Sequence, residues 1–300
     1  ALVAGRDAQA GMKRVLAALG ASTWVGGAVA LAAALAALPL LRLLNAPAEV
    51  LPLALSLMWW LAPAMLLDAW NASMASVMRA HLRARDTLVV MGVMHATHLG
   101  LAVPLMWGVG AWPGLGLPGF ALALLVARSL ALVLHLWLWR HRLGLRPAAA
   151  DWWHLPRAEL SAMAHIGLPG AAENIAYRLC FMVSVAVAGS LGTQALATQA
   201  YAQQFMMLVL LFGLATGLSV EIVVGHLVGA GRLHEAHRLV RRALALGLGV
   251  SLIVATVAAL AGPWLLRLFT QDTKIIAAAG VLLWWTVLLE PGRTFNLVVI

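Results

Sequence analysis

The stretch Val15–Leu41, VLAALGASTWVGGAVALAAALAALPLL, holds no charged side chain. A helix needs about 20 mainly apolar residues to cross the hydrocarbon core of a bilayer, so this run is long enough to span it. Ala243–Leu266 is a second uncharged run of sufficient length. These stretches decide the fold class, because runs of this kind predict a membrane protein built of helices.

Two other runs are too long for a single span and contain their own breaks. Leu88–Ala127 and Leu179–Val220 are both uncharged throughout. Clusters of glycine and proline interrupt helices, and such clusters lie within 108–119 and 189–193. Dividing the chain at these breaks predicts eight spans: 14–41, 49–78, 87–108, 117–140, 157–189, 194–228, 236–267 and 275–300.

Composition supports lipid as the main solvent of these helices. Hydrophobic residues make up 63% of the chain, charged residues 10%, and the mean hydropathy is +0.92. Soluble domains carry about 25% charged residues. The single cysteine, Cys180, excludes a disulfide framework and a cysteine-rich metal site. We expect no cofactor and no bound metal beyond a coupling ion.

The net charge of +9 indicates orientation in the membrane. The positive-inside rule places loops rich in Lys and Arg in the cytoplasm. Alternate predicted loops hold 14 of the 20 basic residues: Arg6, Lys13, Arg14, Arg79, Arg83, Arg85, Arg140, Arg142, Arg146, Arg157, Arg232, Arg238, Arg241 and Arg242. We therefore expect the Ala1 side to be cytoplasmic, the bilayer to be the main partner, and nucleic acid to be no partner.

The sequence also contains an internal repeat with a constant offset between its two copies. Leu40–Leu43 recurs as Leu265–Leu268, and Trp59-Trp60 recurs at the same offset as Trp284-Trp285. Six predicted spans separate equivalent positions, and an even number gives both copies the same orientation. This predicts a parallel repeat about an axis along the membrane normal.

Neither copy of the repeat is complete within the chain. We expect a parent protein of about 450 residues with twelve helices, if both halves of the repeat are complete in it. The fold class is an all-α, polytopic helical bundle with eight of the twelve helices present. Residues 1–147 would be the last four helices of the first lobe, and 148–300 the first four of the second.

Local motifs in this order resemble the multidrug and toxic compound extrusion (MATE) transporters. Those that carry the resemblance are Gly229–Ala236 with its weaker echo Ala4–Ala10, Ile166–Asn174, Gly192–Gln199, Glu290–Asn296, and Met78–Ala80 followed by Arg85–Thr87. The resemblance covers the whole chain, from the loop before helix three into helix ten.

The resemblance implies a secondary active antiporter of the bacterial inner membrane. Such a protein exports cationic or amphipathic organic compounds in exchange for Na+ or H+ by alternating access, with acids inside the lobes carrying the ion. We expect it to be a monomer. In some members a glutamate of the second lobe lies later along helix seven than Glu173; at that spacing this sequence has Tyr177 and Arg178.

Charged residues inside predicted spans are the candidate functional groups. A charge at a helix centre costs about 3 kcal/mol on insertion scales, so it faces a protein interior or a water-filled cavity. The candidates for substrate binding or ion coupling are Glu173, Glu221, Glu290, Asp68, Arg293, Asn174 and Tyr177.

Structural roles for these charges remain open. Glu290 and Arg293 could neutralise each other at i, i+3, and Glu221 could pair with an interfacial Arg or His. Asp68 and Arg293 occupy equivalent repeat positions with opposite charge, which raises the hypothesis of an ion pair between lobes. His95 and His98 share a helix face, but a packed polar pair is favoured over a metal site there.

Two other functions compete with the export of drugs. Intramembrane enzymes show paired Asp, His-Glu-x-x-His or Gly-x-Ser-x-Gly motifs near a span, and the sequence contains none. We therefore expect no enzyme. A flippase of lipid-linked precursors from the same superfamily is the alternative; a cavity richer in Arg than in acids would favour it.

Overall fold

The computed structural model describes residues 8–43, 49, 51–110, 112–155 and 157–299. Their elements are α1 (Ala8–Leu43), α2 (Leu51–Ala80), α3 (Ala84–Trp107), α4 (Leu117–Leu138), one π-helical turn η1 (Trp139–Leu143), α5 (Ala149–Trp153), α6 (Arg157–Ser190), α7 (Thr193–Gly229), α8 (Leu233–Leu266) and α9 (Thr273–Val299). Within this part of the chain, eight helices are long and apolar enough to cross a membrane. They match the eight predicted spans, which confirms the all-α membrane fold.

The glycine-rich breaks end and start helices as predicted. Between α3 and α4 the backbone turns through Gly108 at φ +85° and Gly114 at φ +75°, a region that favours glycine. A Cβ at Gly108 would lie 1.9 Å from the carbonyl oxygen of Trp112. This turn therefore requires glycine, and it returns α4 along α3, on which it packs.

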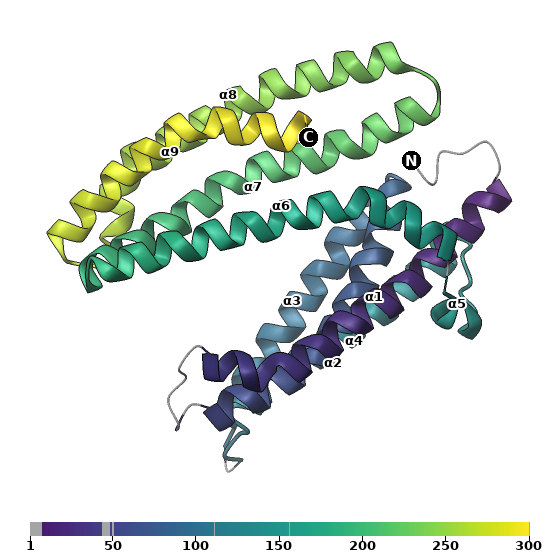
Figure 1. Ribbon diagram of the computed structural model, residues 1–300, viewed down its shortest axis with the longest axis horizontal. Coiled ribbons are helices and arrows are strands. Elements are labelled where there is room, and N and C mark those ends of the chain that lie inside the picture. Colours follow the sequence, from purple (N-terminus) through teal and green to yellow (C-terminus); the bar gives the residue numbers. More distant parts are fainter. Residues whose placement is uncertain (1–7, 44–48, 50, 111, 156, 300) are drawn as a thin grey trace. The chain divides into compact units, whose positions relative to one another are not determined.

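Residues 2–163 form one compact unit, which contains α1 to α5. In it α1 packs on α2, α2 on α4, and α3 on α4 (Figure 1). Its core cluster joins side chains of these four helices and of η1, among them Leu19, Met74, Met78, Val90 and Trp139. The unit is thus a four-helix arrangement with an apolar interior at the end where η1 lies.

The unit ends later than the predicted lobe boundary at residue 147. Helix α5 belongs to it because α5 and the residues after it pack on α1. Trp24 Nε1 donates to the Trp153 carbonyl oxygen at a distance of 3.1 Å. A Cβ at Gly20 would lie 2.1 Å from the carbonyl oxygen of His154. The assignment of residues to two lobes stays a prediction.

Residues 164–300 form the second unit, in which α7, α8 and α9 pack pairwise against one another (Figure 1). Small residues allow close approach: a Cβ at Gly217 would lie 2.2 Å from the carbonyl oxygen of Leu297. The packing of α8 on α9 parallels that of α1 on α2, the pair at the equivalent position of the predicted repeat.

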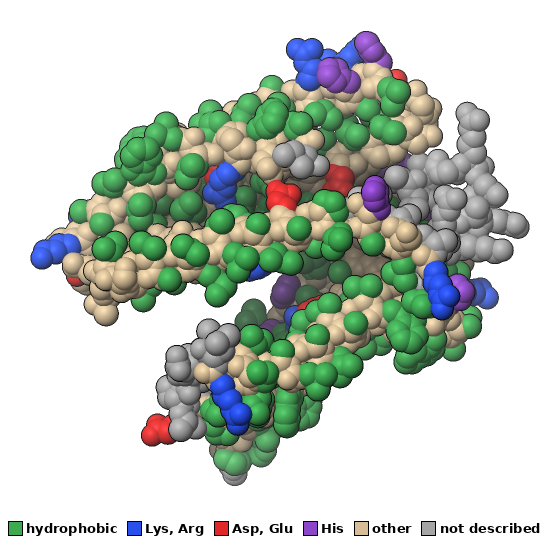
Figure 2. Space-filling model, viewed as in Figure 1, with side chains coloured by type: hydrophobic (Ala, Val, Ile, Leu, Met, Phe, Trp, Pro, Cys, Tyr) green, Lys and Arg blue, Asp and Glu red, His purple; other side chains and the backbone are tan. Residues whose placement is uncertain are grey.

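Large apolar side chains are exposed along the helices, for example Leu35, Leu88 and Leu288. Figure 2 shows hydrophobic side chains over much of the visible face of each unit, while basic and His side chains gather at a few helix ends. A soluble monomer rarely exposes such wide apolar patches. These surfaces suit contact with lipid or with further helices.

Candidate ion and substrate site

The most deeply buried acid of the described residues is Glu290, inside the span Thr273–Val299. Its side chain is 1% exposed, and it accepts a hydrogen bond from Arg293 Nη1 at 2.9 Å. The i, i+3 pair that the sequence left open is therefore formed. Because Arg293 binds Oε1, the Oε2 atom of the carboxylate remains to interact with another group.

Hydroxyl groups share the buried face of α9 with Glu290. Thr286 and Thr294 stand one turn before and one turn after it, and both are buried. Thr286 Oγ1 donates to the carbonyl of Leu282, whereas Thr294 Oγ1 is buried with no hydrogen-bond partner among the described residues. A buried hydroxyl without a partner is costly, and here it lies one turn from a carboxylate.

Neighbouring features add polar groups to this face. Ser251 on α8 is 1% exposed, and a Cβ on Gly247, one turn earlier, would lie 3.2 Å from Thr294 Cγ2. Pro291 follows Glu290 inside α9 and has no N–H, so the carbonyl of Val287 lacks its helical donor. Carboxylate, hydroxyl and carbonyl oxygens are the ligands of hard cations. This α9 face could hold a proton or a cation.

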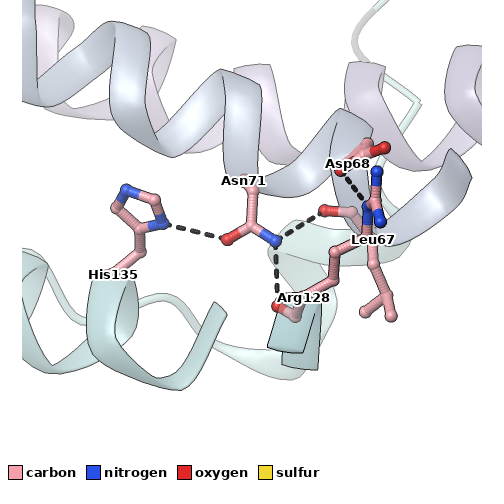
Figure 3. A network of polar contacts seen from close by, with 5 residues as sticks. All are labelled: Leu67, Asp68, Asn71, Arg128 and His135. Carbon is pink, nitrogen blue, oxygen red and sulfur yellow. Dashed lines mark hydrogen bonds and ion pairs between the residues drawn. The ribbon is translucent and has the colours of Figure 1, made fainter. Parts of the chain in front are cut away.

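A second polar network joins α2 and α4 in the first unit (Figure 3). Arg128 Nε donates a hydrogen bond to Asp68 Oδ1. Asn71 Nδ2 donates to the carbonyl oxygens of Leu67 and Arg128, each at a distance of 3.0 Å. Asn71 Oδ1 lies 2.9 Å from Nδ1 of His135, a buried residue. The charged pair and the amide together connect the two helices inside the span.

The hypothesis of an ion pair between Asp68 and Arg293 gains no support from these contacts. Asp68 pairs with Arg128 on α4, and Arg293 pairs with Glu290 on its own helix. Each group therefore has a partner within its own unit, and the pairing between lobes stays a prediction.

The remaining candidates lie on exposed faces of their helices. Glu173, Asn174 and Tyr177 are exposed on α6, where Asn174 Nδ2 donates to the Gly170 carbonyl at 2.9 Å. Glu221 is exposed on α7. The contacts of the described residues do not bring these side chains together with Glu290, so their roles stay predictions.

Sequence reasoning missed part of both polar groups. Asn71, His135 and Thr294 were not candidates, and Arg128 was not expected to pair with Asp68. Arg128 and His135 lie two helical turns apart, which places both on one face of α4. That spacing is the signal that could have found the network.

Outside the spans, one acid is tied to a neighbouring helix. Gln194 Nε2 donates to Asp272 Oδ2 at 3.0 Å, and the backbone N–H of Lys274 donates to its Oδ1. The hydrogen bond from Gln194, followed by that from Lys274, holds the pKa of Asp272 below its ordinary value. Asp272 thus joins the start of α7 to the start of α9.

The sequence is similar to that of a known protein family. The MatE family profile matches residues 169–300. The uncharacterized transporter YisQ of Bacillus subtilis is 26% identical over 295 residues, covering 98% of this chain and 65% of YisQ. The second half of the chain thus matches the MATE family, and the chain as a whole is similar to a transporter of Bacillus subtilis. Members of this family are transporters and not enzymes, as the sequence predicts.

Other relatives carry names that refer to drug resistance. The probable multidrug resistance protein NorM of Rhizobium meliloti is 27% identical over 247 residues, covering 80% of this chain and 51% of that protein. The multidrug resistance protein PmpM of Pseudomonas aeruginosa is 27% identical over 139 residues, covering 46% of this chain and 29% of PmpM. The chain thus spans about two thirds of YisQ and less of the others.

Solved MATE structures share the fold. A MATE transporter in the bent conformation matches with a TM-score of 0.85 and 18% identity, covering 98% of this chain and 66% of that one. An outward-facing multidrug resistance MATE transporter of the MOP superfamily gives a TM-score of 0.83, also at 18% identity, with the same coverage. At this identity the likeness supports the fold alone, and the expected arrangement of membrane helices is confirmed.

Proposed function

We propose that the protein is a secondary active antiporter that exports cationic or amphipathic organic compounds in exchange for Na+ or H+. The observation that carries this proposal is Glu290: an acid 1% exposed, inside a membrane span, in the part of the chain that matches the MATE family. Burying an acid in the membrane is expensive, and acids in such positions commonly bind protons or ions. The drug-resistance names of NorM and PmpM point to the substrate class.

In this mechanism Glu290 binds the coupling ion, and Arg293 controls how tightly Glu290 binds it. Arg293 Nη1 holds one oxygen of the carboxylate, and the hydroxyl of Thr294 stands one turn away. An arriving ion competes with the guanidinium for the carboxylate. Binding of the ion then changes the balance of charge on the buried face of α9, and a two-state transporter responds when its two conformations differ in affinity for the ion.

The distribution of charge supports a position in the bacterial inner membrane, with the Ala1 side in the cytoplasm. Arg232 in the turn between α7 and α8 is exposed, as are His234, His237 and Arg238 at the start of α8. Figure 2 shows basic and His side chains gathered at a helix end of this unit. Basic loops of this kind stay on the cytoplasmic side. The bilayer and small organic cations are the partners we propose, with the protein acting as a monomer.

The flippase alternative is less well supported. The relatives with descriptive names are multidrug resistance proteins, and within the spans the acids Asp68 and Glu290 are each paired with an arginine. A site for an anionic lipid-linked precursor would favour unpaired basic groups.

Efflux from proteoliposomes tests the proposal. Vesicles holding the protein are loaded with the cation tetraphenylphosphonium, and a Na+ gradient or a pH gradient is imposed separately. We expect efflux with at least one of the two gradients. If neither gradient drives efflux of this cation, of ethidium or of any other organic cation tried, the antiporter proposal fails.

A further inference from the structure

His135 lies on α4 in the contact between α2 and α4, inside the span Leu117–Leu143. The residue is 2% exposed, and Trp139, one turn later, is fully buried. Trp139 Nε1 donates to the Met74 carbonyl at 3.2 Å, so hydrogen bonds join α2 to α4 on one side of the imidazole and to η1 on the other. His135 is therefore fixed in a closed helix contact.

The hydrogen bonds of Asn71 determine which nitrogen of His135 carries the proton. The Nδ2 group of Asn71 donates to two carbonyl oxygens, those of Leu67 and Arg128, which fixes the orientation of the amide. The Oδ1 atom of Asn71 then faces His135 Nδ1 at a distance of 2.9 Å (Figure 3). An amide oxygen can only accept, so Nδ1 must carry the hydrogen. In the neutral ring the lone pair then lies on Nε2.

The Nε2 atom is buried and has no hydrogen-bond partner among the described residues. Leaving a buried acceptor without a donor costs about 1–3 kcal/mol. Most buried polar groups avoid this cost, so an exception calls for a functional or structural reason. A packed histidine serving structure alone would gain nothing from a lone pair held in this way.

We propose that His135 is a proton-binding site of the transporter, with Nε2 as the atom that accepts the proton. The new N–H bond forms on the free lone pair, and the ring gains one positive charge while its Nδ1–H bond to Asn71 is kept. Hydration stabilises an imidazolium, so proton uptake accompanies a conformation in which Nε2 reaches water or an acceptor. Proton binding thereby becomes linked to opening of the contact between α2 and α4.

Charged groups on the neighbouring elements determine the response to this new charge. On α2, Arg79 is basic, and Asp68 is paired with Arg128 of α4. On α3, the titratable groups include His95, His98 and Asp86, and Asp86 faces Arg83.

The charged and titratable groups of the turn η1, Arg140, His141 and Arg142, are all exposed. Asp68 and Asp86 each face an arginine, so among the described neighbours neither acid is left to neutralise an imidazolium at His135.

Nitrogen NMR of the protein in nanodiscs, with 15N-labelled histidine, tests the site without any transport. The signals lost in His135→Gln identify His135, because the variant lacks that imidazole. Glutamine is chosen because its amide can still donate to Asn71 but binds no proton. His95→Gln is the matched control, since His95 is a histidine of a neighbouring span outside this network.

We expect a neutral ring protonated on Nδ1 at about pH 8, and a second proton on Nε2 on acidification, since histidine is the side chain suited to this range. A neutral ring protonated on Nε2 contradicts the assigned geometry and overturns the proposal. So does a ring that stays neutral throughout the acid range in which the protein remains folded.

The role in transport rests on the proposed antiport and is tested apart from the site itself. With a pH gradient, we expect efflux of tetraphenylphosphonium to be lost in His135→Gln and kept in His95→Gln. Equal efflux from wild type and His135→Gln overturns the transport role. Absence of efflux from wild type under every gradient contradicts the antiport proposal instead, and the NMR result then decides the proton site alone.

Discussion

Replacing Gly217 with alanine should separate α7 from α9. The added Cβ would lie 2.2 Å from the carbonyl oxygen of Leu297, whereas ordinary van der Waals contact begins at 3.4 Å. The two helices must move apart to close this difference, because the obstacle is backbone, which cannot rotate away as a side chain would. Leu297 lies two turns after Glu290, so this close approach keeps the buried face of α9 in place.

The magnitude follows from two opposing effects. Overpacking of a close contact costs about 1–3 kcal/mol, while alanine improves helix propensity over glycine by about 1 kcal/mol. The backbone clash places the cost at the upper end of its range, so the net loss is about 1–2 kcal/mol. For units of this size 1 kcal/mol lowers the melting temperature by about 3 °C, so we expect a decrease of roughly 3–6 °C.

Gly249→Ala is the matched control for this substitution. Gly249 lies on α8, and its added Cβ would meet no atom of the described residues within 4 Å. We expect its melting temperature to be unchanged or slightly higher, measured by tryptophan fluorescence on heating in the same detergent. If Gly217→Ala melts at or above the wild-type temperature, α7 and α9 do not touch as described and the reasoning is wrong.

Two further predictions concern charged groups. The double reversal Asp68→Arg with Arg128→Asp should recover thermal stability that either single change loses, whereas Asp68→Arg with Arg293→Asp should not; recovery only in the second combination would favour the ion pair between lobes. Because the pKa of Asp272 is lowered, the stability from its ionised form is present above the ordinary Asp pKa and is lost as pH falls through the lower folded value. Gln194→Leu should raise the pKa of Asp272 in a carboxyl 13C NMR titration, and an unchanged titration would refute the role of Gln194.

The membrane helices could be predicted from the sequence because their signal is local. Uncharged runs specify each span, and glycine clusters specify where α3 and α6 end. The Glu290–Arg293 pair could be predicted as one possibility for the same reason, since i, i+3 neighbours share a helix face whatever the tertiary fold. Local spacing therefore accounts for the spans and for one of the two buried polar groups.

The network between α2 and α4 could not be predicted in this way. Asp68 and Arg128 are far apart in the chain, and their contact depends on how two helices rotate about their axes. In a chain so rich in apolar residues, hydrophobic periodicity says little about which face of a helix is buried. The repeat instead suggested Arg293 as the partner of Asp68, because equivalence of position was the only long-range information available.

The α5 segment shows the same limit. Its docking depends on the hydrogen bond from Trp24 to the distant Trp153 carbonyl and on the close approach at Gly20. The local sequence of α1 does not explain why a glycine stands at position 20, in the middle of a helix. Its role becomes visible only when the chain that packs against it is known.

The central claim, that Glu290 couples an ion to transport, is tested most directly by comparing two transport modes in Glu290→Gln. We expect this variant to lose efflux of tetraphenylphosphonium driven by a Na+ or pH gradient, while it keeps exchange of labelled for unlabelled cation at equal ion concentrations. The control Asp272→Asn, an acid outside the spans, should keep both modes. Gradient-driven efflux by Glu290→Gln at the wild-type rate would contradict the account.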